Sequence, residues 1–121
     1  DVYKRQANGN WDILLIKTDP DGNLQWSKTY GQYLFDVIEG EQSIIETTDG
    51  GYMFVGAYAD VGAFGLWLVK MDVDGNIEWD KRYENWLGHS IVEVEDGYVI
   101  GGSAWNGNWF DFLWLKTDKG F

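Results

Sequence analysis

One stretch of this chain occurs nearly three times, and this repetition constrains the fold more than any other feature. Residues 66–83 have a near-copy at residues 13–30 and a truncated copy at residues 113–121. One lysine position recurs in all three copies, at spacings of 53 and 46 residues: Lys17, Lys70 and Lys116. A chain that repeats itself at intervals of this size is built from repeated structural units.

A second repeated block lies between these copies. The sequence Ser-Ile-Ile-Glu at residues 43–46 matches Ser-Ile-Val-Glu at residues 90–93, and Tyr52 matches Tyr98, each following a glycine. The two spacings differ because the connecting segments differ in length, whereas the blocks themselves stay aligned. Length changes confined to connections are expected of a structural unit whose strands are repeated.

Each unit is predicted to consist of four antiparallel strands. Residues 66–71 form a short apolar run that is too short for a helix, which favours a buried strand. The dipeptide Asp74-Gly75 indicates a tight turn. Residues 76–83 then alternate between two sets of side chains, as a half-exposed strand does. Upstream, residues 43–47 and 51–58 are predicted to form a hairpin around residues 48–50.

Four short strands in a repeat of about 50 residues point to the blade of a β-propeller. We therefore expect an all-β fold, a fragment of a β-propeller with about two and a quarter four-stranded antiparallel blades. Residues 8–30 would be the outer two strands of a first blade, 43–83 a complete second blade and 90–121 part of a third. Residues 1–7 match no repeat position and resemble a translated adapter tail, so we expect them to be non-native and the chain to be a piece of a longer one.

Composition excludes several classes of function. The net charge of −11 and the isoelectric point near 4.2 argue against a nucleic-acid-binding protein, which needs a basic surface. The sequence has no cysteine, so disulfides, thiol chemistry and cysteine-based zinc sites are excluded. No apolar run approaches 18 residues, so we expect no membrane span.

The acidic turns and the recurring aromatic residues are best explained by structure. Asp72 and Asp74 could ligate calcium, but the glycine follows the second aspartate too early for a known calcium loop, and turn-forming Asp is favoured. The residues Trp26/Trp79 and Tyr30/Tyr83 recur at matching positions. Recurrence in each unit favours a packing role, because a functional site needs only one copy. We expect neither a metal site, a cofactor site nor catalytic residues.

Two features remain as candidate ligand-binding residues. His89, the only histidine, is expected in a short loop before the first strand of the third blade. The segment around Trp105, Asn106, Asn108 and Trp109 is expected to join two strands, and it combines indole faces with amides, a pairing that suits sugar rings. The alternative is that these tryptophans fill the gap between blades, and a lone histidine without a nucleophile is a weak catalytic candidate.

The pattern Trp-Asp-Ile-Leu-Leu-Ile-Lys-Thr-Asp-Pro-Asp-Gly-Asn-Leu-Gln-Trp, followed by Ser-Ile-Ile-Glu-Thr-Thr-Asp-Gly-Gly-Tyr, resembles the β-propeller repeats of large secreted or surface proteins of bacteria and archaea. Its Asp-Gly-Asn-x-x-Trp core is also similar to the blades of quinoprotein dehydrogenases. The resemblance covers residues 8–121. The repeat sequence differs from the Asp-box motif of sialidases, so it does not support a sialidase-like activity.

This resemblance implies a non-enzymatic propeller segment of an extracellular or cell-surface protein, acting as a scaffold or in protein or glycan interaction. Its partners would be further blades of the same parent chain, together with a carbohydrate or a protein. The alternative is a fragment of a propeller enzyme, either quinoprotein-like or acting on glycans. The two visible units are nearly identical at strand positions and carry no acid–base pair, which favours the scaffold.

Overall fold

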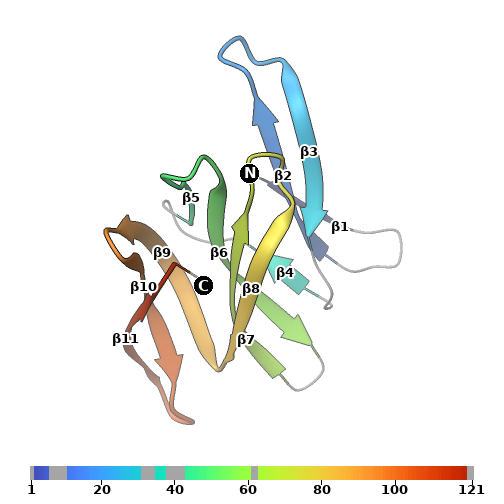
Figure 1. The fold of residues 1–121 in the computed structure, drawn as a ribbon. Coiled ribbons are helices and arrows are strands. Elements are labelled where there is room, and N and C mark those ends of the chain that lie inside the picture. The colour runs from blue at the N-terminus through green and yellow to red at the C-terminus, as the bar shows by residue number, and fades with distance from the viewer. Residues whose placement is uncertain (1, 6–10, 31–34, 38–42, 61–62, 120–121) are drawn as a thin grey trace.

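The fold is all-β, as expected from the sequence. The computed structural model describes residues 2–5, 11–30, 35–37, 43–60 and 63–119, and this part of the chain contains strands and no helix. Hydrogen bonding joins the strands of residues 2–84 in one eight-stranded sheet and those of residues 86–117 in a three-stranded sheet. A single parallel bridge divides the larger sheet into two antiparallel parts, here called the first and second sheets, and the three-stranded sheet is the third; they are coloured blue, green to yellow, and orange to red in Figure 1. In chain order, the strands are β1 (Val2–Arg5), β2 (Trp11–Thr18), β3 (Leu24–Tyr30), β4 (Phe35–Val37), β5 (Ile44–Glu46), β6 (Tyr52–Asp60), β7 (Ala63–Met71), β8 (Ile77–Glu84), β9 (Trp86–Val94), β10 (Gly97–Trp105) and β11 (Phe110–Thr117).

The middle sheet is the complete four-stranded unit that the repeat predicts. Its strands pair antiparallel in chain order, β5 with β6, β6 with β7 and β7 with β8. The turn between β7 and β8 closes at Gly75, whose φ of 83° only glycine adopts without strain. The short strand β4 pairs with the other half of β6 and touches β2 through one parallel bridge, which connects the first sheet to the second.

The first sheet contains a strand that the sequence analysis did not expect. Val2–Arg5, set aside as part of a tail outside the fold, forms β1 and pairs antiparallel with β2. The order β1, β2, β3 matches the order β6, β7, β8, so β1 takes the place of the second strand of a unit. The repeat pattern could not predict this, because an open strand edge pairs through its backbone and requires no matching sequence.

The third sheet contains the three strands β9, β10 and β11, and its first strand is longer than expected. We predicted a strand from Ser90, preceded by a loop, whereas β9 already begins at Trp86. The chain passes from β8 to β9 through the single turn residue Asn85, which has a φ of 67°. Asparagine tolerates this left-handed conformation better than most residues, so a very short connection suffices.

The middle sheet is buried on both faces. Successive side chains of a strand point to opposite sides, and those of β6 and β7 divide between two hydrophobic clusters. The first cluster joins the first and second sheets and contains Ile13, Leu15, Tyr30, Phe54, Tyr58, Trp67, Val69 and Met71. The second cluster joins the second and third sheets and contains Met53, Val55, Leu66, Leu68, Ile91, Tyr98 and Ile100. The predicted antiparallel pairing of β6 with β7 and the predicted buried strand at residues 66–71 are thus confirmed. In β6, Phe54 is buried and Tyr52 is half-buried.

The same repeat positions meet at both contacts between sheets. Trp26 of the first sheet lies edge-on to Tyr52 of the second, with ring centroids 6.1 Å apart. Trp79 of the second sheet lies against Tyr98 of the third at 6.4 Å. The predicted packing role of the recurring aromatic residues is therefore confirmed, although of the four only Tyr30 is buried and the others are half-buried.

Candidate interaction surface

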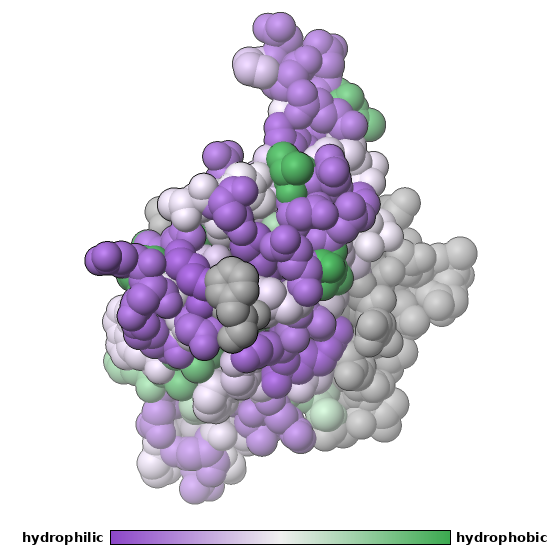
Figure 2. Space-filling view, viewed as in Figure 1, coloured by the Kyte–Doolittle hydropathy of each residue, from purple (hydrophilic) through white to green (hydrophobic). Residues whose placement is uncertain are grey.

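The outer face of the third sheet exposes large apolar side chains. Phe112 is 98% exposed, Trp114 is 78% exposed and Val92 is 52% exposed. Strand pairing places Trp114 opposite Gly101, so the residue paired with this tryptophan adds no side chain to the face. Figure 2 shows one side of the molecule, where green hydrophobic atoms lie among pale ones over the β9–β11 sheet at the lower left. A face of this kind is typical of an interaction surface.

His89 lies on this sheet and not in a loop, which corrects the sequence analysis. Gly101 pairs with Ser90 and Gly102 pairs with Gly88, so His89 is the extra residue of a β-bulge in β9. Bulges re-aim side chains at sheet edges and beside binding sites. The His89 Nε2 atom is 3.4 Å from the Ser103 Oγ atom.

A shallow hollow of about 450 Å³ opens beside this pair. Its wall includes Phe110, Asp111 and Phe112 in addition to His89 and Ser103. Apolar rings next to a few polar groups are the usual lining of a ligand-binding hollow. The hollow extends from His89 to Phe110, which is the first residue of β11 and directly follows the hairpin loop.

The other four predicted site residues lie at the end of β10, which holds Trp105, and in the loop that follows it. The Asn106 Oδ1 atom accepts hydrogen bonds from the backbone N–H groups of Asn108 and Trp109, at 2.9 and 3.1 Å. The Asn106 Nδ2 atom donates to an Asp111 carboxylate oxygen at 3.2 Å. The ring of Trp105 packs against Phe110 at 5.0 Å between centroids.

These contacts change the chemistry that the loop can offer. The Asn106 amide, expected to recognise hydroxyl groups, instead closes its own turn in the manner of Asx residues. The Trp105 indole packs against Phe110 of its own hairpin, a contact within one sheet and not between two. The Trp109 indole is 61% exposed and offers a flat apolar face to a partner.

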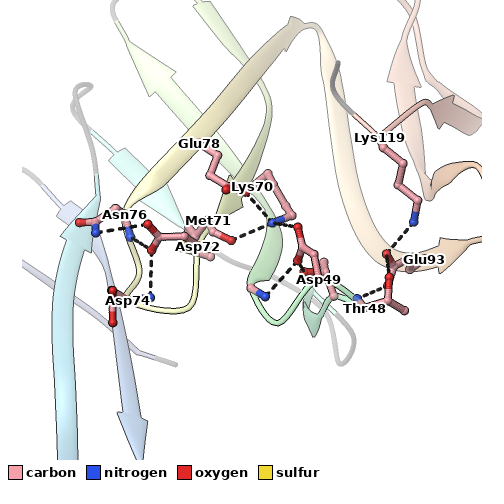
Figure 3. A network of polar contacts seen from close by, with 12 residues as sticks. Thr48, Asp49, Lys70, Met71, Asp72, Asp74, Asn76, Glu78, Glu93 and Lys119 are labelled. Atoms are coloured by element: carbon pink, nitrogen blue, oxygen red, sulfur yellow. Dashed lines mark hydrogen bonds and ion pairs between the residues drawn. The ribbon is translucent and has the colours of Figure 1, made fainter.

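Sequence reasoning missed a buried lysine that joins two strands and a turn. Lys70 of β7 is only 2% exposed, and its ammonium contacts Asp49 at 3.0 Å and Glu78 at 2.8 Å (Figure 3). It also donates a hydrogen bond to the Met71 carbonyl oxygen at 2.9 Å. Burial alone would lower the pKa of Lys70, but the two carboxylates outweigh it and raise that pKa. The recurrence of lysine at this position in all three units could have indicated a structural role. Lys17 and Lys116 also contact polar side chains of their own sheets.

Asp49 is correspondingly held in its ionised form. Its carboxylate accepts a hydrogen bond from the Thr47 hydroxyl at 2.5 Å and one from the Gly51 N–H group at 3.0 Å. These bonds, with Lys70, lower the pKa of Asp49 from 3.8 to about 2. The turn between β5 and β6 is thereby tied to β7.

A second polar group links the middle and third sheets. Glu93 of β9 accepts hydrogen bonds from the backbone N–H and the hydroxyl of Thr48, at 2.8 and 3.0 Å. The Lys119 ammonium contacts the same carboxylate at 2.6 Å, as Figure 3 shows on its right side. These bonds lower the pKa of Glu93 against the opposing effect of burial. Polar contacts therefore reinforce the apolar packing between these sheets.

The acidic turn at residues 72–76 uses its own carboxylate. The Asp72 Oδ1 atom accepts the backbone N–H groups of Asp74 and Asn76, each at 2.9 Å. Asp19 does the same for Asp21 and Asn23 in the first sheet. Within the described residues, no group of three or more His, Asp or Glu is close enough to hold a metal ion. The geometry favours the turn-forming role of these aspartates.

Comparison of the chain with protein-family models, curated proteins and solved structures finds no match. Among the described residues, no helix has the length and apolar character needed to cross a membrane.

Proposed function

We propose that this chain is a non-enzymatic segment of a β-propeller, built from repeated sheets and used as a scaffold for protein or glycan interaction in a secreted or cell-surface protein. One observation carries the proposal, namely that the same repeat positions pack at both contacts between sheets. Trp26 meets Tyr52 in the first contact, and Trp79 meets Tyr98 in the second.

The distribution of the core supports a role as a repeated building unit. The middle sheet has no solvated face among its central residues, because β6 and β7 bury alternate side chains in opposite directions. A free-standing antiparallel sheet usually keeps one face in water. A unit buried on both faces is suited to stacking between two like neighbours, where stability comes mainly from the contacts between units.

The interaction side of the proposal rests on the third sheet and its loop. Trp109, in the loop between β10 and β11, directly precedes Phe110, which lines the hollow beside His89. Exposed indole and phenyl rings with a few polar groups suit the apolar faces of sugar rings or the side chains of a protein partner.

A series of tandem chains tests the proposed architecture. Residues 43–89 contain one four-stranded unit and the connection to the next, so copies of this segment can be joined end to end. A propeller predicts that one copy number between about four and eight gives a compact monomer with the highest melting temperature. Small-angle scattering and thermal unfolding would show it. A stability that rises steadily with copy number, with ever longer particles, would indicate an open stack and contradict the propeller.

A further inference from the structure

We propose that the outer face of the third sheet, carrying Val92, Phe112 and Trp114, is a docking surface for one more antiparallel sheet of the same repeat. The inference rests on the proposed function and names the partner that this surface takes. The expected partner presents an aromatic or aliphatic residue at the positions of Tyr98 and Ile100, on the second strand of its sheet.

The repeat register identifies this face with two faces that are already covered. Phe112 and Trp114 stand at the positions of Leu66 and Leu68, 46 residues earlier. Both leucines are fully buried against the third sheet. Ile13 and Leu15 stand at the same positions in the first sheet and are buried against the second. Two of three equivalent faces are therefore covered by the next sheet, and the third is bare.

The size of the bare side chains is consistent with a packing surface. In the middle sheet, Leu68 pairs across the strands with Val55, and both are buried. In the third sheet, Trp114 pairs with Gly101, so a larger side chain faces a smaller one. A Cβ built on Gly101 would meet only the Ser90 Oγ atom, which leaves the space beside the indole open. The pair Trp114 and Gly101 therefore has about the same total side-chain volume as the pair Leu68 and Val55, with most of that volume on one strand.

A second copy of this chain is a poorer occupant. The face that its first sheet offers contains Leu14 and Ile16, at the positions of Trp67 and Val69. Phe54 pairs with Val69 in the second sheet, whereas the described part of β1 pairs with residues 11–14 only and leaves Ile16, at the position of Val69, without such a partner from β1. A repeated sheet with all of these positions matches the covered faces more completely.

The test extends the full chain by one unit. Residues 76–121 are appended after Gly120, which supplies the last strand of the third sheet and the three strands of a fourth. The chain has no cysteine, so Trp114→Cys, placed in the original copy only, gives a single thiol on the docking face. We expect this thiol to react with a water-soluble maleimide at least about tenfold more slowly in the extended chain than in the 121-residue chain.

Three controls make the result specific. Trp109→Cys, on the exposed loop, should react equally in both chains. Val55→Cys, nearly the size of the native valine, should be protected in both, because it lies between the second and third sheets. An extended chain whose appended copies of Tyr98 and Ile100 are both serine should restore the reactivity of the thiol at position 114.

The outcomes separate this inference from the proposed function. If Val55→Cys is protected but the thiol at position 114 reacts as fast in the extended chain, the docking surface is refuted and the stacked repeat stands. If Val55→Cys is protected only in the 121-residue chain, the appended sheet disrupts the stack and the inference is also refuted. If Val55→Cys reacts freely in both, the stack itself fails. Protection of position 114 that rises with the concentration of the 121-residue chain would make a second copy the occupant and overturn the partner named here.

Discussion

Removing the indole of Trp79 should weaken the contact between the second and third sheets. Trp79 lies on β8 with its ring against Tyr98, which is 1% exposed, and it packs on the second hydrophobic cluster. Trp79→Ala deletes this packing while leaving the backbone pairing of β8 with β7 in place. The variant therefore reports the contact between sheets rather than the pairing within one sheet.

The expected loss follows from how far the ring is buried. A fully buried Trp replaced by Ala costs about 3–5 kcal/mol, which the repeat alone predicts for this position. The ring is only half-buried in the structure, so we expect the free energy of unfolding to fall by about 2–3 kcal/mol. Of this loss, the contact with Tyr98 contributes about 0.5–1.5 kcal/mol. The equivalent Trp26→Ala should cost at least as much, since the Trp26 indole N–H also donates a hydrogen bond to the Val73 carbonyl oxygen at 3.2 Å.

Urea unfolding followed by circular dichroism measures these losses, with Trp114→Ala as the matched control. Trp114 is 78% exposed, so its truncation should change the free energy of unfolding by under about 0.5 kcal/mol. A double-mutant cycle with Tyr98→Ala isolates the pair. A loss below about 1 kcal/mol for Trp79→Ala, or an equal loss for Trp114→Ala, would refute the packing assigned to the repeat.

Four further predictions follow from individual contacts. Gly75→Ala should destabilise more than Gly22→Ala in thermal unfolding: both residues have positive φ, which costs about 1–2 kcal/mol, but only at Gly75 would a Cβ come within 3.0 Å of the Trp26 ring. Stability should fall as the pH drops from about 4 toward 2, because the Asp49 carboxylate, whose pKa is lowered to about 2, stabilises the fold above its unfolded pKa of 3.8 and loses that effect on protonation. Asp49→Asn should flatten this part of the pH profile, and an unchanged profile would contradict the role of Asp49. Calorimetric titration should reveal no specific calcium binding, and micromolar binding that Asp74→Asn abolishes would contradict the turn-forming role. The chain should self-associate increasingly as salt screens its charge of −11, and sedimentation showing a monomer at all salt concentrations would contradict this.

The repeat pattern predicted the strands of the middle sheet well, for a physical reason. Apolar runs, tight-turn dipeptides and alternation all depend on neighbouring residues, and residues 43–83 carry each of these signals. The antiparallel pairing of β6 with β7 was predicted from these signals, and the structure adds the register, in which Tyr52 faces Met71 and Ala57 faces Leu66.

Contacts made through the backbone could not be predicted in this way. The pairing of Val2–Arg5 with β2 depends on an open strand edge and not on a side-chain pattern. The position of His89 depends on a β-bulge, which adds one residue to a strand without a signal in the sequence. The candidate site at Trp105, Asn106, Asn108 and Trp109 stays a prediction, because the hydrogen bonds of Asn106 and the packing of Trp105 on Phe110, which determine what these residues can offer a ligand, depend on geometry that the sequence does not show.

The contacts between sheets are tested most directly by nuclear Overhauser effects between the aromatic rings of the two equivalent pairs. With tryptophan and tyrosine labelled selectively, the account predicts cross-peaks from Trp26 to Tyr52 and from Trp79 to Tyr98, the two pairs that bring ring centroids to 6.1 and 6.4 Å. Observation of both would establish that successive sheets stack through the same repeat positions. Absence of either cross-peak in the folded chain would contradict the repeated stack.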